Sequence, residues 1–274
     1  MKLERLNPHL GARISGLKLD QLTMADRGEL RARLDEHQVL FFTGQSLDAR
    51  AFHRFAAIVG ELQAPDDAAP SLKTMEGDLK AIHYIDVEGT ARGTYSDVWH
   101  SDVSFFEQPT LGAVLQPMVL PSLGGDTLWA SMYAAYEALP DSLRRVADEL
   151  SALHQVAYQG QAMQCVHPVV RVNPVTGRRG LYVNRLFTKG IVGMTPVESA
   201  NLLELLLGHC TLPDFQLRFH WTPDIVAVWD NRFTMHYAVR DYSEPRRMMR
   251  VGLAGERPMG LADYAAAQRQ TVAA

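Results

Sequence analysis

Two residues of types that bind metals, His100 and Asp102, lie two positions apart in Trp99-His100-Ser101-Asp102-Val103. This segment is predicted to be extended, and side chains two positions apart on a strand point to the same face. The imidazole and the carboxylate would then converge on one point. A second histidine would complete a set of two histidines and one carboxylate, which suits non-haem Fe(II). The spacing alone is a weak signal, because about one such pair is expected by chance.

His236 is the candidate for the second histidine. It follows a predicted strand in Trp229-Asp230-Asn231-Arg232-Phe233-Thr234-Met235-His236-Tyr237-Ala238. Strands far apart in the sequence can be neighbours in a jelly roll, so its distance from His100 along the chain is no objection. Taken alone, however, a histidine is more often a surface or packed residue than a ligand.

A third candidate is the strand-like segment Arg246-Arg247-Met248-Met249-Arg250. On a strand, Arg246 and Arg250 share one face and Arg247 points the other way. Buried guanidinium groups are costly unless they meet anions, and their fork matches a carboxylate. The segment therefore predicts a clamp for an acidic substrate or cosubstrate. The alternative is an exposed edge strand with solvated arginines.

The turn Gly124-Gly125-Asp126-Thr127 is a fourth candidate. Its glycines permit a tight turn. The hydroxyl of Thr127 could then donate one hydrogen bond to the same carboxylate. The alternative is an ordinary turn followed by a residue that favours strands.

Short strands with a few helices around them are predicted to position these residues. Helices are expected at about 23–38, 48–59, 131–138, 140–150 and 195–208, and strands at 39–42, 79–87, 113–115, 127–130, 167–172, 181–184, 215–221, 225–229 and 246–253. This pattern favours a mainly β fold with peripheral helices: a double-stranded β-helix, or jelly roll, with helical insertions. We expect one domain over 1–274, with 1–60 as a helical N-terminal addition and 258–274 as a flexible tail.

The composition excludes several classes of function. A net charge of -4 gives no electrostatic reason to bind nucleic acid or an anionic membrane. No stretch of about 18 apolar residues is present, so no membrane-spanning helix is expected. The first six residues lack the apolar run of a signal peptide, and we therefore expect a cytoplasmic protein. Cys165 and Cys210 are expected to be free thiols.

Together, these ordered motifs resemble those of the taurine dioxygenase-like Fe(II)/2-oxoglutarate-dependent oxygenases. The resemblance runs from about Leu17 to Pro258. The family pattern is W-H-x-D, then G-G-D-T, then W-D-N-R-x(3)-H-Y-A, then two arginines on one strand. Four motifs in this order are far more specific than any one of them.

The resemblance implies a role for each candidate. His100, Asp102 and His236 would hold Fe(II) and form the catalytic centre, which 2-oxoglutarate would chelate through its keto-acid end. Thr127 and Arg246 would bind the far carboxylate of 2-oxoglutarate, and Arg250 would lie near the substrate or share that anion. With O2, such an enzyme hydroxylates its substrate and releases succinate and CO2.

The register of the arginine clamp has two interpretations. The interval from His236 to Arg246 is one residue shorter than is usual in the family. Arg247 would restore the interval, but it points the wrong way on a regular strand. Strand parity favours Arg246, and a β-bulge would reverse that choice.

The expected substrate is a small anionic molecule other than taurine. Taurine-cleaving members carry a histidine in the loop before the first motif, and residues 63–71 contain none. Ser96 stands where those members have asparagine, four residues before the first ligand. Ser96, Val103, Phe187 and Arg250 are the candidate substrate contacts. His83 lies on a predicted strand and is interpreted as a packed histidine rather than a site residue.

Two other functions remain open from the sequence. One is a related biosynthetic oxidation, such as desaturation or the formation of a ring or an isonitrile. The other is a metal-binding jelly roll without catalysis. The expected partner is a small molecule rather than a nucleic acid or a membrane, and the Leu-rich run 202–207 and the N-terminal helices could serve a homo-oligomer.

Overall fold

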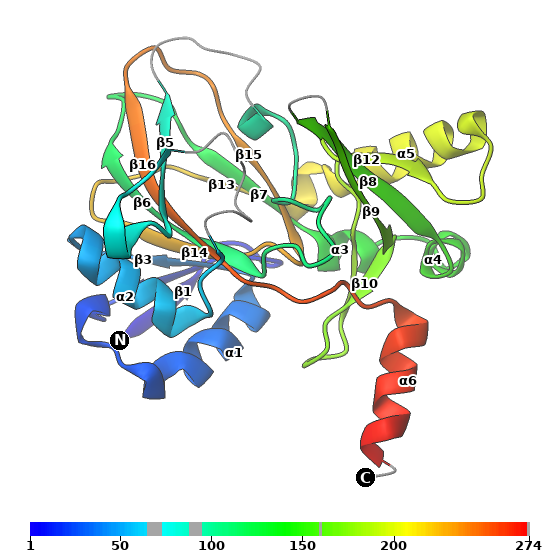
Figure 1. Ribbon diagram of the computed structural model, residues 1–274, viewed down its shortest axis with the longest axis horizontal. Helices are drawn as coiled ribbons and strands as arrows, with labels where there is room; N and C mark the ends of the chain where they lie inside the picture. Colours follow the sequence, from blue (N-terminus) through cyan, green and yellow to red (C-terminus); the bar gives the residue numbers. More distant parts are fainter. Residues whose placement is uncertain (65–72, 88–94, 159–160, 273–274) are drawn as a thin grey trace.

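The computed structural model describes residues 1–64, 73–87, 95–158 and 161–272 (Figure 1). Its largest element is an eight-stranded sheet in the order β1-β2-β3-β14-β6-β16-β5-β4. The strands are β1 Lys2–Arg5, β2 Ala12–Ser15, β3 Val39–Phe42, β14 Val226–Asp230, β6 Gly112–Val119, β16 Arg246–Leu253, β5 Ile82–Val87 and β4 Lys73–Thr74. Strands from both ends of the chain therefore lie side by side, as expected for a jelly roll.

A second sheet has the order β13-β7-β15, and it lies opposite the first. Its strands are β13 Gln216–Phe219, β7 Thr127–Ser131 and β15 Thr234–Ala238. Phe41 of the large sheet stacks on Phe219 with ring centroids 3.7 Å apart and meets Trp129 edge-on at 5.4 Å. These rings belong to the buried cluster that fills the space between the two sheets.

Two smaller sheets complete the strands, in the orders β12-β8-β9 and β10-β11. They comprise β8 Ser151–Tyr158, β9 Gln161–Pro168, β10 Val170–Val172, β11 Arg179–Leu181 and β12 Thr188–Ile191. The strands predicted at 167–172 and 181–184 overlap β10 and β11, which pair in antiparallel fashion.

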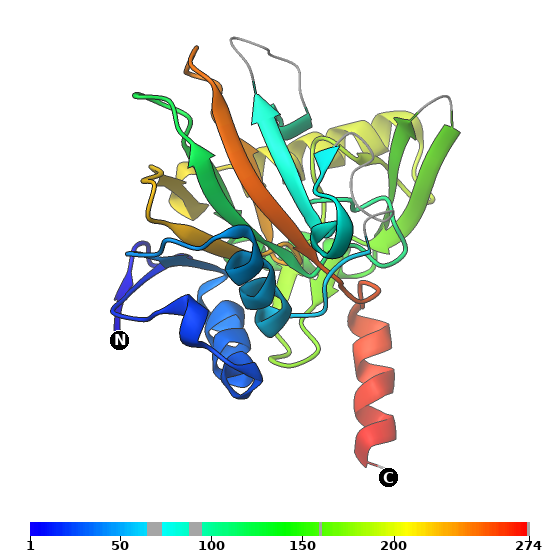
Figure 2. The same cartoon turned by 60° about the vertical axis from the view of Figure 1, so that its left-hand side comes forward.

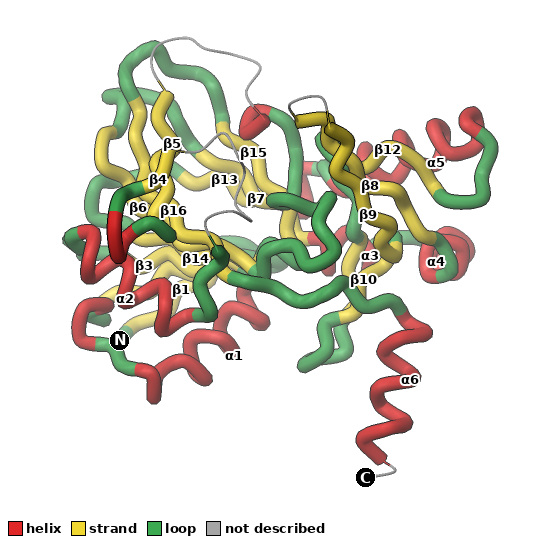
Figure 3. Tube along the Cα trace, in the orientation of Figure 1, coloured by secondary structure: helices red, strands yellow, loops and turns green. Residues whose placement is uncertain are grey.

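Helices cover the outer faces of the sheets (Figure 3). They are α1 Arg27–His37, α2 Ala49–Val59, α3 Met132–Glu137, α4 Asp141–Asp148, α5 Pro196–Cys210 and α6 Leu261–Val272. Phe52 and Phe55 of α2 pack on the outer face of the large sheet, while Leu203 and Leu206 of α5 lie in the cluster behind the smaller one. The helix predicted at 195–208 corresponds to α5, which begins with a capping box formed by Thr195 and Glu198.

The two ends of the chain differ from the sequence expectation. Residues 1–60 are helical only in part, because β1 and β2 join the large sheet. Each has four residues, which is too short to give a clear alternating pattern. Residues 258–274 were expected to be a flexible tail, but they contain helix α6, which projects from the body (Figure 2). Alanine is the strongest helix former, which accounts for a helix in this Ala-rich segment.

Two simpler expectations can be checked directly. Cys165 and Cys210 are free thiols, as predicted. Within the described residues, no helix combines the length and the apolar character needed to cross a membrane.

A buried cluster of charges ties the turn after β14 to α1. Arg232, which is 2% exposed, donates to Asp230 at 2.8 Å and to Asp35 at 2.6 Å. Asp230 and Asp35 are also buried. Because this turn leads directly into β15, the cluster fixes the start of the strand that carries His236.

Replacing Arg232 with alanine should lower the free energy of unfolding by about 3 kcal/mol or more, because two buried carboxylates lose their cation. Arg185→Ala is the matched control. Its ion pair with Glu204 is at the surface, and its loss should cost about 1 kcal/mol or less. Urea denaturation measures both values, and equal losses would show that the buried cluster contributes no more than a surface pair.

Candidate metal centre

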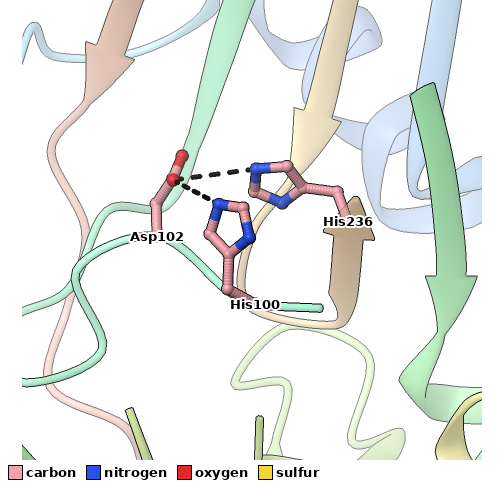
Figure 4. A group of neighbouring side chains, drawn as sticks. All are labelled: His100, Asp102 and His236. Carbon is pink, nitrogen blue, oxygen red and sulfur yellow. Dashed lines mark ion pairs between the residues drawn. The ribbon is translucent and has the colours of Figure 1, made fainter. Parts of the chain in front are cut away.

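His100, Asp102 and His236 meet between the two sheets (Figure 4). One ligand atom from each residue can be chosen so that all lie within 4.8 Å of one another. The two Nε2 atoms approach the same oxygen, Asp102 Oδ1, at 3.5 Å from His100 and 3.7 Å from His236. These distances exceed those of ordinary hydrogen bonds, and they leave the three atoms arranged around a shared space.

The local backbone differs from the predicted strand. His100 forms an isolated β-bridge with His236: His100 N–H donates to the carbonyl of His236 at 3.1 Å, and His236 N–H donates to that of His100 at 2.8 Å. The extended stretch ends there. Asp102 lies in a turn, and Val103 has a left-handed φ of 45°. The side chains converge, but the turn rather than strand periodicity brings Asp102 towards the histidines. His236 lies on β15 instead of following a strand.

Asn231 fixes this turn. Its Oδ1 accepts from the backbone N–H of Asp102 at 2.7 Å, and its Nδ2 donates to the carbonyl of Asp102 at 3.0 Å. Ser101 Oγ also donates to the carbonyl of Thr234 at 2.9 Å. Asn231 belongs to the motif that contains His236, but its spacing in the sequence does not indicate this contact with Asp102.

The protonation states suit a cation. His100 Nδ1 lies 2.7 Å from the carbonyl of Val98 and donates to it, so that Nε2 is the ring atom that faces Asp102. Burial, followed by the neighbouring His100, lowers the pKa of His236 to about 3, so this ring is neutral. Burial alone would raise the pKa of Asp102, but Arg250 and the two histidines hold it well below its usual value. Two imidazoles and a carboxylate are the donor set that Fe(II) takes in non-haem sites.

Arg250 lies on the other side of Asp102. Its Nη2 donates to Asp102 Oδ2 at 2.8 Å, and its side chain is buried. Oδ2 is therefore occupied by the guanidinium, while Oδ1 faces the histidines. A partner that orients a ligating carboxylate in this way is common around metals.

Arg246 packs on the glycine turn that leads into Thr127. A Cβ on Gly125 would lie 3.3 Å from Arg246 Cδ, so the turn packs directly on this side chain. Arg246 is 4% exposed, and its Nε has no hydrogen-bond partner among the residues that the structure describes. Burial lowers its pKa. Thr127 Oγ1 accepts from the indole of Trp221 at 3.0 Å, which leaves its own proton to donate.

Arg247 points away from this region. It pairs with Asp86 at 2.6 Å on the exposed side of the sheet. The register between β16 and β6 does shift between Arg247 and Met248, but the pairing of β16 with β5 is regular over the same residues. The irregularity therefore leaves the parity of β16 intact, with Arg246 inside and Arg247 outside.

The candidate substrate contacts lie in two places. Val103, Phe105 and Phe187 form a buried apolar cluster, with the two phenylalanine rings 4.9 Å apart. Ser96 Oγ accepts from Arg240 Nη2 at 2.8 Å. Of the loop 63–71, residues 65–71 lie outside the described part of the chain.

Replacing Asn231 with alanine should weaken iron binding about 10- to 100-fold, because the turn that presents Asp102 loses both of its hydrogen bonds. Asn7→Ala also removes two hydrogen bonds, one to the carbonyl of Gln216 and one from the backbone N–H of His9, and it is the control that should leave iron affinity unchanged. Anaerobic titration with Fe(II) measures both. Wild-type affinity in Asn231→Ala would show that the turn holds Asp102 without this side chain.

Known proteins resemble this chain over most of its length. Residues 2–252 match the sequence model of the family described as "Taurine catabolism dioxygenase TauD, TfdA family". An alpha-ketoglutarate-dependent sulfate ester dioxygenase from Pseudomonas putida is 37% identical, over 92% of this chain and 89% of the relative. An (S)-phenoxypropionate/alpha-ketoglutarate-dioxygenase from Delftia acidovorans is 31% identical, over 90% of this chain and 92% of the relative.

Solved structures share the fold. A taurine dioxygenase from Burkholderia xenovorans superposes with a TM-score of 0.85 and 35% identity, covering 96% of this chain and 92% of that one. The structure of AAD-2 in complex with Mn(II) and N-oxalylglycine superposes with a TM-score of 0.84 and 26% identity. The match covers 94% of this chain and 99% of that one. These neighbours confirm the predicted jelly roll with peripheral helices.

Proposed function

This chain belongs to the taurine catabolism dioxygenase TauD, TfdA family, and we propose that His100, Asp102 and His236 hold its catalytic Fe(II). The enzyme is a non-haem iron, 2-oxoglutarate-dependent dioxygenase. The observation that carries the proposal is the approach of two imidazole Nε2 atoms to one carboxylate oxygen. Bound Fe(II), with 2-oxoglutarate and O2, would supply the oxidising power to hydroxylate a C–H bond, and succinate and CO2 would be released.

We assign the far carboxylate of 2-oxoglutarate to Arg246 and Thr127. Arg246 is buried beside the glycine turn, where an entering carboxylate would offset the cost of burying the guanidinium. Thr127 would add one hydrogen bond from its hydroxyl. By holding the far carboxylate of 2-oxoglutarate, Arg246 and Thr127 would direct its keto-acid end towards the metal ligands. Their role would therefore be to position the cosubstrate.

We propose a small anionic substrate other than taurine. The relatives named above act on sulfate esters and phenoxypropionate, which are both anions. Phe187 would form an apolar wall, and Val103 would offer a backbone N–H. Ser96 would add a polar contact, and Arg250 would supply positive charge. The walls exclude water from the reacting C–H bond.

Succinate formation tests this function. Metal-free protein is supplied with Fe(II) and 2-oxoglutarate, with and without O2, and with hexyl sulfate, hexanesulfonate, 2-phenoxypropionate or taurine. We expect oxygen-dependent succinate that one of the first three compounds stimulates more than taurine does. Absence of oxygen-dependent succinate would overturn the function, and strongest stimulation by taurine would overturn the substrate assignment. Mass analysis of the product separates hydroxylation from desaturation or ring formation.

A further inference from the structure

The side chain of Ser104, which follows Asp102 by two residues, is fully buried. Its Oγ accepts from Asn184 Nδ2 at 2.9 Å and shares a hydrogen bond of 2.9 Å with His154 Nδ1. Asn184 and His154 are themselves 1% and 0% exposed. The hydroxyl therefore ties the chain beside the metal ligands to two segments that are distant in the sequence. Buried polar groups with their hydrogen bonds made rigidify the segments that they join.

The carboxamide of Asn184 also reaches the buried apolar cluster of Val103, Phe105 and Phe187. Its Oδ1 accepts from the backbone N–H of Phe187 at 2.8 Å, while its Nδ2 donates to Ser104. One side chain thus fixes the spacing between the two segments that contribute to the cluster. The rings of Phe105 and Phe187 meet across this spacing, with their centroids 4.9 Å apart.

His167 holds the backbone of the same segment. Its Nε2 lies 2.9 Å from the carbonyl of Phe106 and donates to it, because a carbonyl can only accept. Burial lowers the pKa of His167 to about 4, although the carbonyls of Phe106 and Ser104 oppose this. Burial, followed by His167, lowers the pKa of His154 to about 3, although the carbonyl of Tyr182 opposes this. Both rings are therefore neutral near pH 7, and they act through hydrogen bonds rather than charge.

The backbone that these contacts hold is strained at Val103. Its φ of 45° is left-handed, a conformation that β-branched residues rarely adopt. The N–H of Phe106 closes the turn by donating to the carbonyl of Val103 at 3.0 Å. Strained backbone persists only where the surrounding structure fixes it. Asn231 fixes Asp102 on one side of Val103, and the contacts of Ser104 fix the other side.

Packing holds the end of this segment less firmly. Phe106, Glu107, Gln108 and Thr110 border a cavity of about 320 Å³. Side chains that border an open space lack contacts on that side. The hydrogen bonds to Ser104 and to the carbonyl of Phe106 therefore contribute more to fixing the segment than they would in a close-packed core.

We propose that Ser104, Asn184 and His154 are positioning residues, which fix the apolar cluster relative to the metal ligands and so set where the reacting C–H bond of the substrate lies. This inference rests on the proposed function, in which the cluster forms a wall of the substrate site. A substrate displaced by about 1 Å can lose about 100-fold in rate. Loss of the network should therefore affect the substrate reaction while the iron and 2-oxoglutarate sites keep their geometry.

The variant Ser104→Ala, which removes both hydrogen bonds of the hydroxyl, tests this role. The probe is whichever of hexyl sulfate, hexanesulfonate and 2-phenoxypropionate the wild type oxidises best. Each O2 takes four electrons, two from 2-oxoglutarate and two from the probe, and added ascorbate supplies the second pair when the probe is misplaced. We expect the KM for the probe to rise and the product formed per succinate to fall about 10-fold. The KM for 2-oxoglutarate and its visible absorption with Fe(II) should change little, because Asn231 still holds Asp102.

Ser131→Ala is the matched control. Ser131 is also 0% exposed, and its Oγ donates to Gln38 Oε1 at 2.8 Å and accepts from the N–H of Ala134 at 3.2 Å. The control therefore also loses two buried hydrogen bonds, and it should keep the wild-type KM and the wild-type ratio of product to succinate. If Ser104→Ala does not fold, Asn184→Leu takes its place, because it breaks the same link at similar volume.

The outcomes separate this inference from the proposed function. If the wild type oxidises a probe and Ser104→Ala keeps its KM and product ratio, the positioning role is wrong and the function stands. Loss of the visible absorption in Ser104→Ala would also overturn the inference, because the network would then hold the iron site. If no probe is oxidised, amide hydrogen exchange decides. Faster exchange at 103–106 in Ser104→Ala than in Ser131→Ala supports the positioning role, and equal exchange overturns it.

Discussion

His236→Ala should lower iron binding and succinate formation by more than about 100-fold. Removing a residue that only orients a metal ligand lowers metal affinity or activity by up to about 100-fold. The loss should be larger for His236, because His236 is proposed to bind the metal itself. The neutral Nε2 lies 3.7 Å from Asp102 Oδ1, and alanine leaves this position without a donor. Iron content after anaerobic loading and aerobic succinate release provide two independent measurements.

His53→Ala provides the control for this variant. His53 lies on α2, on the outer side of the large sheet, away from the metal ligands. We expect it to bind iron and release succinate as the wild type does. If His236→Ala retained iron at the wild-type ratio and remained active, the ligand assignment would be wrong.

Arg246→Ala should raise the KM for 2-oxoglutarate roughly 30-fold or more. Truncating one partner of a buried, hydrogen-bonded charge pair costs about 2 kcal/mol or more, and each 1.4 kcal/mol corresponds to a factor of ten. The pairing is expected to be strong because Arg246 is 4% exposed and burial already disfavours its charge in the absence of an anion. Steady-state kinetics with 2-oxoglutarate as the varied component measures the effect.

Arg247→Ala is the matched comparison, since the two arginines are adjacent on β16. Arg247 pairs with Asp86 at the surface, so its loss should change this KM less than about threefold. The opposite result, with Arg247→Ala impaired and Arg246→Ala normal, would show that Arg247 is the clamp.

The strand parity of the arginines could be predicted from the sequence. Successive side chains on a strand point to opposite faces of the sheet. This alternation predicted that Arg246 and Arg250 point inward and Arg247 outward, as observed. A β-bulge in β16 would have reversed the side-chain alternation. The register shift lies only in the pairing of β16 with β6, and the pairing with β5 is regular, so the alternation is kept. The strand 246–253 was predicted with its observed bounds.

The route by which Asp102 reaches the histidines could not be predicted in the same way. The sequence favoured a strand, whereas the structure has a turn with Val103 in a left-handed conformation. Contacts from Asn231, distant in the sequence, hold this turn. The spacing of residues around Asp102 does not reveal a partner 129 positions away in the sequence.

The visible absorption of the protein with Fe(II) and 2-oxoglutarate, recorded without O2, tests the central claim most directly. This charge-transfer band requires 2-oxoglutarate to chelate an iron that the protein holds. We predict the band in the wild type, its loss in His100→Ala and His236→Ala, and its recovery only at higher 2-oxoglutarate concentration in Arg246→Ala. A band of wild-type strength in either histidine variant would contradict the account.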